Sequence, residues 1–199
     1  MNKKKIFGAL IGLTILIVCI SAFVLKNNTE EAAAQQKKDN EYLTAAAHFY
    51  NDIDYFEFFS QTVLSGYSTT WSEAIDNHED FNVAIATKKT ESSTMIDNVT
   101  WLYEEMGKRL KTVSEAAKEQ PGTYKEVYEE YKTIYGIVTA LKEQVESPSG
   151  SLISFNQNVN SLIQEYKKAK ANIYIAVSND IKAEAEKIKE ENADNSKNN

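Results

Sequence analysis

The sequence contains a single cysteine, Cys19, and only seven glycines and two prolines in 199 residues. One cysteine cannot form a disulfide within the chain, so the fold must be stabilised by its core alone. So few helix breakers over this length favour long helices over a many-turned β fold. A domain without disulfides outside the cytoplasm is also more typical of a bacterial protein than of a small eukaryotic secreted one.

Residues that carry chemistry are also scarce. The only histidines are His48 and His78, and neither has a glutamate three residues before it, as the helices of di-iron proteins do. The chain has no Gly-x-Ser-x-Gly elbow, no glycine-rich phosphate loop and no EF-hand spacing. Adjacent carboxylates such as Glu104 and Glu105 point about 100° apart on a helix and do not share a site. The sequence therefore predicts a non-enzymatic protein with no metal and no cofactor.

Charge is distributed unevenly along the chain. The net charge is −7, but residues 1–25 contain three lysines and no acidic residue, which leaves 19 basic against 29 acidic residues in the rest. A domain this acidic is repelled by phosphates, and no basic stripe offsets the repulsion. We therefore expect no nucleic-acid partner.

An apolar segment follows the first lysines. Residues 6–25 are uncharged and mostly apolar, and as a helix with about 1.5 Å rise per residue they would span roughly 30 Å, the thickness of a bilayer core. The basic segment 1–5 should stay in the cytoplasm, which places the remainder of the chain outside. The sequence thus predicts a single-pass anchor that contacts membrane lipid through residues 6–25.

Two other readings of this segment compete with the anchor. A cleaved signal peptide would release a secreted protein, but its apolar region is about 7–15 residues long, and the small residues Ala32–Ala34 lie well past Leu25. A lipoprotein signal needs a small residue before the cysteine, whereas Val18 precedes Cys19 deep in the apolar run. We favour the uncleaved anchor and keep secretion after cleavage as the alternative.

Beyond a polar spacer at residues 26–40, apolar residues recur every three or four positions through residues 41–183. This pattern predicts an all-α fold in which the transmembrane helix is followed by an elongated antiparallel bundle of about four helices. The tail, residues 184–199, is rich in Lys, Glu and Asn. We expect it to be polar and partly disordered, above all from Asp194.

Local signals divide this bundle. Gly66 could kink the first helix, and a turn is expected at 77–80 with Asp80 as the cap of the next helix. The polar interval Thr87–Thr94 leaves open whether the second segment is one helix or two. Pro121-Gly122 forms the clearest turn, and Thr123 with Glu126 matches a capping box. The last helix opens at Ser149 or Ser151.

Aromatic residues crowd the first helix of this bundle, between residues 49 and 59. Packing in the core accounts for most of them, but they are too numerous for one narrow face, and apolar side chains left outside usually mark a binding surface. The candidate partner surface is therefore made of Phe49, Tyr55, Phe58, Phe59 and Trp71.

These features favour a protein–protein interaction module on the outer side of the bacterial cell envelope, with an envelope or phage protein as its partner. A small-molecule-sensing bundle is one alternative, although such receptors usually add a second transmembrane helix. A structural spacer is another, and Gly8 and Gly12 could bring two anchors together. The sequence does not identify the partner or the oligomeric state.

Overall fold

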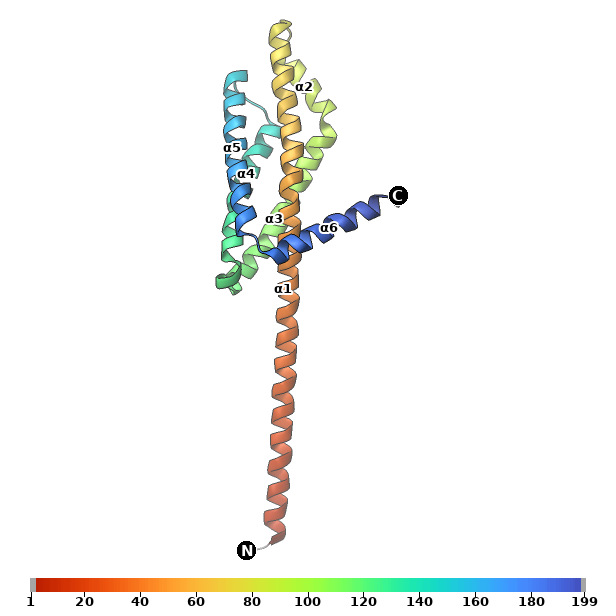
Figure 1. Cartoon of the computed structure of the whole chain (residues 1–199), viewed down its shortest axis with the longest axis vertical. Coiled ribbons are helices and arrows are strands. Elements are labelled where there is room, and N and C mark those ends of the chain that lie inside the picture. Colours follow the sequence, from red (N-terminus) through yellow and green to blue (C-terminus); the bar gives the residue numbers. More distant parts are fainter. Residues whose placement is uncertain (1–2, 198–199) are drawn as a thin grey trace. The chain divides into compact units, whose positions relative to one another are not determined.

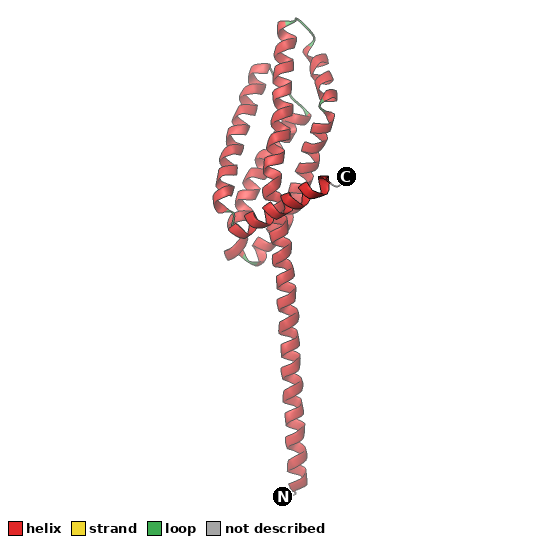
Figure 2. Ribbon diagram, turned by 45° about the vertical axis from the view of Figure 1, so that its right-hand side comes forward, coloured by secondary structure: helices red, strands yellow, loops and turns green. Residues whose placement is uncertain are grey.

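The computed structural model describes the backbone of residues 3–197 and the side chains of residues 30–194. Its described part contains helices and no strand (Figure 1; Figure 2), which confirms the predicted all-α fold. The helices are α1 (Lys3–Asp76), α2 (Phe81–Glu91), α3 (Ser93–Glu119), α4 (Pro121–Glu146), α5 (Leu152–Ala176) and α6 (Asn179–Lys197).

The chain divides into two compact units, Met1–Glu41 and Tyr42–Asn199, and α1 contributes to both. In the first unit, the side chains of the predicted anchor, residues 6–25, lie outside the described range. Among the described residues, none of the helices is both long enough and apolar enough to span a bilayer. Residues 30–40, the described part of the predicted spacer, are helical and almost entirely exposed.

The second unit is a helical bundle around one hydrophobic core. Residues 42–76 of α1 run beside α3, α4 and α5 (Figure 2), and α4 packs against both α3 and α5. The predicted three- and four-residue spacing of apolar residues is confirmed on α4, because every third or fourth side chain from Val127 to Val145 is buried and forms one stripe. The core positions of α1 follow the same spacing: Ala46, Phe49, Ile53, Phe56, Val63, Tyr67, Trp71 and Ala74.

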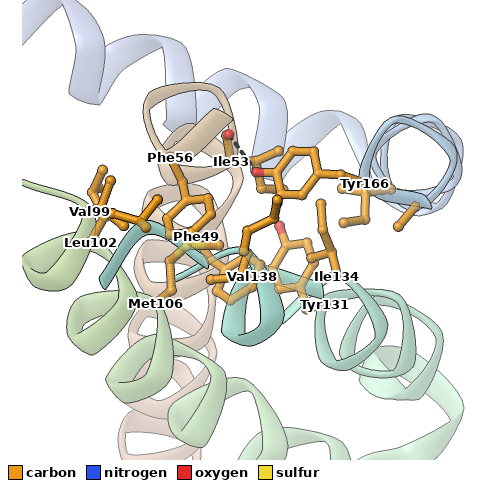
Figure 3. Packing of buried hydrophobic residues seen from close by; sticks show 14 of the residues in the cluster. Phe49, Ile53, Phe56, Val99, Leu102, Met106, Tyr131, Ile134, Val138 and Tyr166 are labelled. Carbon is orange, nitrogen blue, oxygen red and sulfur yellow. Dashed lines mark hydrogen bonds between the residues drawn. The ribbon is translucent and has the colours of Figure 1, made fainter. Parts of the chain in front are cut away.

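Three fully buried tyrosines link these helices through hydrogen bonds to backbone carbonyls, and Figure 3 shows the bond of Tyr166 to Ile53. Each hydroxyl donates to a carbonyl of another helix: Tyr67 on α1 to Val145 on α4 (3.0 Å), Tyr131 on α4 to Ala46 on α1 (2.8 Å), and Tyr166 on α5 to Ile53 on α1 (2.7 Å). A buried hydroxyl without a partner is costly, so each bond favours one axial position of the two helices over others.

One of these bonds also completes a helix end. Val145 lies in the last turn of α4, where carbonyls lack a partner within the helix, and the Tyr67 hydroxyl supplies one. The next carbonyl, that of Glu146, accepts from the ammonium group of Lys89 on α2 at 2.6 Å. A cation at this position also complements the negative end of the helix dipole.

The boundaries of α1 and α2 agree with the predicted turn but not with the suggested kink. α1 continues through Gly66 because the neighbouring residues Leu64 and Tyr67 are buried and hold the segment in the core. It ends at the expected turn, where His78 has a positive φ of 60° and the Asp80 carboxylate accepts from the backbone N–H of Asn82.

The polar interval Thr87–Thr94 does break the second segment, and Ser92 serves both as the C-cap of α2 and as the N-cap of α3. Within α2 only Ile85 is buried, so little packing opposes the change of direction at this point.

The predicted capping box at Thr123 is wrong. α4 begins three residues earlier, with Gln120 as the N-cap and Pro121 in its first turn, so Thr123 already lies inside the helix. Proline suits this position because its fixed φ is helical and its missing N–H would be unpaired in any case. The last segment does open at Ser151, whose side chain forms a capping box with Ser154.

That last segment contains two helices, and the tail expected to be partly disordered is helical as far as Lys197. Extended backbone at Val177 ends α5, after which α6 crosses α1 (Figure 1; Figure 2). Ile181, Ala185 and Ile188 form an apolar stripe in this stretch and are all buried against the core. The many Lys, Glu and Asn residues around them obscured this stripe in the sequence. Residues 198–199 of the tail lie outside the described range.

The tyrosine bonds can be tested on α4. Replacing Tyr131 by Phe removes one buried interhelical hydrogen bond while keeping the ring that stacks on Phe49, so we expect the free energy of unfolding to fall by about 1 kcal/mol. Tyr128→Phe on the same helix is the control, because the Tyr128 hydroxyl donates to no described residue. Urea denaturation followed by circular dichroism measures both. Equal stability of the two variants would contradict the assigned role.

Candidate partner-binding surface and pocket

Two of the five predicted surface residues belong to the core, and this part of the prediction is wrong. Phe49 is fully buried and stacks on Tyr131 with 4.2 Å between ring centroids. Trp71 is 5% exposed and packs between Phe81 and Phe155. Both residues belong to the buried stripe on α1, whose members recur every three or four positions, so neither can contact a partner.

The other three predicted residues form a second, outward-facing stripe on α1. Tyr55 is 51% exposed and Phe58 is 61% exposed, while Phe59 is partly buried and contacts Phe58 edge to face at 5.3 Å. Positions three and four apart on a helix share a face, so these side chains lie together beside the core stripe.

Trp101 on α3 extends this surface. Its side chain is 54% exposed and lines the same pocket as Tyr55 and Phe59. We call Tyr55, Phe58, Phe59 and Trp101 the aromatic patch. Trp101 was not among the predicted residues, although the sequence carries a signal for it: it is a large aromatic residue that falls between the buried positions Val99 and Leu102.

The aromatic patch borders a pocket of about 450 Å³ between α1, α3 and α6, which we call the α6 pocket. Its walls combine three patch residues with polar and charged side chains from all three helices. They are His48, Asn51, Asp52, Tyr55, Phe59, Asn98, Trp101, Leu102, Arg109, Ile188, Lys189 and Asn192.

An ion pair joins α1 to α3 at this pocket. The Arg109 guanidinium contacts the Asp52 carboxylate, and both side chains are largely buried. A second nitrogen of Arg109 lies 3.8 Å from Glu105. Burial, and after it the charge of Arg109, lowers the pKa of the nearby His48, so this histidine is neutral at neutral pH.

Asn51 ties α6 to α1 on the same side of the bundle. Its amide nitrogen donates to the carbonyl of Ala185 at 2.8 Å, and the residue is only 4% exposed. Its amide oxygen, by contrast, is buried without a hydrogen-bond partner among the described residues. Such a group costs stability, so only one of the two polar atoms of the Asn51 amide contributes a hydrogen bond to the contact between α1 and α6.

A separate charged cluster links α5 to α1 and is satisfied internally. The Lys170 ammonium lies 2.6 Å from Asp54 and 2.5 Å from Glu57, and the Tyr174 hydroxyl also donates to Asp54. Burial alone would lower the pKa of Lys170, but hydrogen bonds and charge from the two carboxylates outweigh it and raise that pKa. With its charges paired, this cluster fixes helix packing and offers no open site.

Among the described residues, no group of three or more His, Cys, Asp or Glu side chains could hold a metal ion. Comparison of the chain with protein-family models, with curated proteins and with solved structures gives no match. The candidate site therefore rests on the geometry of the aromatic patch and the α6 pocket.

The Asp52–Arg109 ion pair should contribute strongly to the stability of the contact between α1 and α3. Asp52→Asn leaves a buried guanidinium without its main counter-charge and should lower the free energy of unfolding by about 3 kcal/mol. Replacing both partners, Asp52→Leu with Arg109→Met, should recover most of that loss because no buried charge remains.

The control for this test is Asp97→Asn, which removes an exposed carboxylate from the same helix as Arg109 and should change stability by less than about 0.5 kcal/mol. Urea denaturation of the three variants and the unchanged chain measures the free energy of unfolding of each. A double variant as unstable as Asp52→Asn would show that the pair is not the cause.

Proposed function

We propose that this chain is a membrane-anchored, non-enzymatic helical domain that binds another protein at the outer side of the bacterial cell envelope. The observation that carries this proposal is the aromatic patch, in which three of four large aromatic side chains are more than half exposed. Exposed aromatic clusters on an otherwise polar protein lower its solubility, and they are enriched at protein interfaces.

The placement of the patch supports recognition rather than incidental exposure. Its residues come from α1 and α3, two helices joined by a largely buried ion pair, so the backbone positions that carry the rings are set before a partner arrives. Pre-ordered aromatic side chains lose little conformational entropy on binding and provide most of the energy in many interfaces.

The location outside the cytoplasm rests on the sequence of the first 25 residues. Three lysines followed by twenty uncharged residues favour an anchor with its N-terminus in the cytoplasm. The exposed polar helix at residues 30–40 would then act as the spacer between the anchor and the bundle. Envelope proteins, including those of phages that enter or reside in the cell, are the partners that this location makes accessible.

Topology is tested by protease treatment of intact cells that express the chain with a C-terminal tag. We expect the tag to be lost while an N-terminal fragment stays in the membrane fraction, because the bundle lies outside. A tag that is protected in the membrane fraction would place the bundle in the cytoplasm. Recovery of the tag in the medium would show that residues 6–25 act as a cleaved signal.

Partner binding is tested by photo-cross-linking in cells with the full chain. A benzophenone amino acid in place of Phe58, the most exposed residue of the patch, should give a discrete cross-linked product. The same probe in place of Ile153, an even more exposed apolar residue on α5, should not. Each cross-linked product is identified by mass spectrometry, in cells with and without phage challenge.

A second substitution makes this test specific to the patch. Trp101→Ala should weaken the product formed at position 58, whereas Val83→Ala, which removes an exposed apolar side chain from α2, should not. Cross-linking that is absent at position 58, or equal at positions 58 and 153, would argue against an interaction module.

A further inference from the structure

The aromatic patch does more than cover the surface, because three of its four residues also line the α6 pocket. Tyr55, Phe59 and Trp101 contribute to its wall, and Leu102 and Ile188 add apolar surface. Binding energy in protein interfaces is concentrated where a large side chain fills a desolvated pocket ringed by weaker contacts. A pocket of about 450 Å³ has room for one such side chain from a partner.

The charges around the pocket restrict which side chain it can accept. Tryptophan, tyrosine and arginine are the residues that most often fill such pockets. An arginine would need a carboxylate, but Asp52 is already paired with Arg109. The other cation in the wall, Lys189, lies 3.9 Å from Glu186, and His48 is neutral, so no unpaired charge favours a charged ligand.

Polar groups in the wall instead suit an uncharged side chain with one hydrogen-bonding atom. The side chains of His48, Asn98 and Asn192 make no hydrogen bond to any described residue. The buried oxygen of Asn51 also lacks a donor among these residues. Buried tryptophan and tyrosine need a partner for the indole N–H or the phenol O–H, and these groups can provide it.

We propose that the α6 pocket receives a tryptophan or tyrosine side chain of the protein that binds the aromatic patch, with its ring against Tyr55, Phe59 and Trp101. This inference rests on the proposed function and specifies its recognition chemistry. The ring gains apolar contact in the pocket, and its polar atom bonds to an amide or imidazole in the wall.

The two tryptophans of the chain allow a direct test. Trp101 lines the pocket and Trp71 is buried in the core, so 5-fluorotryptophan labelling gives one reporter and one internal control. The full chain in lipid nanodiscs is titrated with N-acetyltryptophanamide, N-acetyltyrosinamide and N-acetylargininamide, and ¹⁹F NMR is recorded. We expect the two aromatic probes to shift the Trp101 resonance saturably, with Trp71 unchanged and no saturable shift from the arginine probe.

A substitution at a half-buried wall position and a matched control connect the pocket to the partner. Asn98→Phe should fill the pocket, abolish the probe shift and weaken cross-linking from position 58, whereas Glu115→Phe, which adds the same ring at an exposed position of α3 outside the pocket, should retain the probe shift and the cross-link. An unchanged Trp71 resonance shows that each variant is folded. No saturable shift, or an equal shift with the arginine probe, would overturn the proposal.

The outcomes separate the pocket from the broader function. If Asn98→Phe removes probe binding but leaves the cross-link at position 58 intact, the patch binds a protein without using the pocket, and this inference fails alone. If the probes bind but position 58 captures no partner, the pocket is a small-molecule site and both the inference and the proposed function fail.

Discussion

A tyrosine hydroxyl that is buried in an apolar core must find an acceptor, and in this bundle the acceptors are backbone carbonyls of neighbouring helices. Helix faces made of similar apolar side chains can slide past one another at modest cost, and this chain has no disulfide to prevent it. The bonds from Tyr131 to Ala46 and from Tyr166 to Ile53 join α4 and α5 to α1 at defined positions along the helix axis. The position of every candidate site residue on α1 follows from that register.

With its register fixed, α1 can carry two different faces. Phe49, Ile53 and Phe56 point into the core, whereas Tyr55 and Phe58 lie on the next face and remain exposed. A helix that packs against three others needs one wide apolar stripe, and additional aromatic residues beside it contribute nothing to the core. Their presence is therefore a cost to the isolated domain, which an interface would recover.

Much of the fold could be predicted because it depends on local spacing. The stripe on α4 and the turn before Asp80 follow from residues close together in the sequence. The prediction of a capping box at Thr123 was wrong because two signals for a helix start overlap here. The helix begins at the proline, Pro121, and not after Thr123. The helix in the tail was not predicted because the many Lys, Glu and Asn residues obscured the buried apolar stripe that includes Ala185. The α6 pocket could not be predicted, since it joins residues from three helices that only tertiary packing brings together.

Two departures from ordinary packing rules meet at the α6 pocket. Elsewhere the bundle satisfies its buried polar groups: Tyr67 bonds to a free helix-end carbonyl, and the hydroxyl of Ser60 bonds within its own helix. The only buried side-chain oxygen or nitrogen without a partner among the described residues is in Asn51, on the wall of the pocket that the exposed aromatic residues surround. Natural sequences are locally consistent except where function opposes stability. The coincidence of these two departures on one surface supports the proposal that a partner binds there.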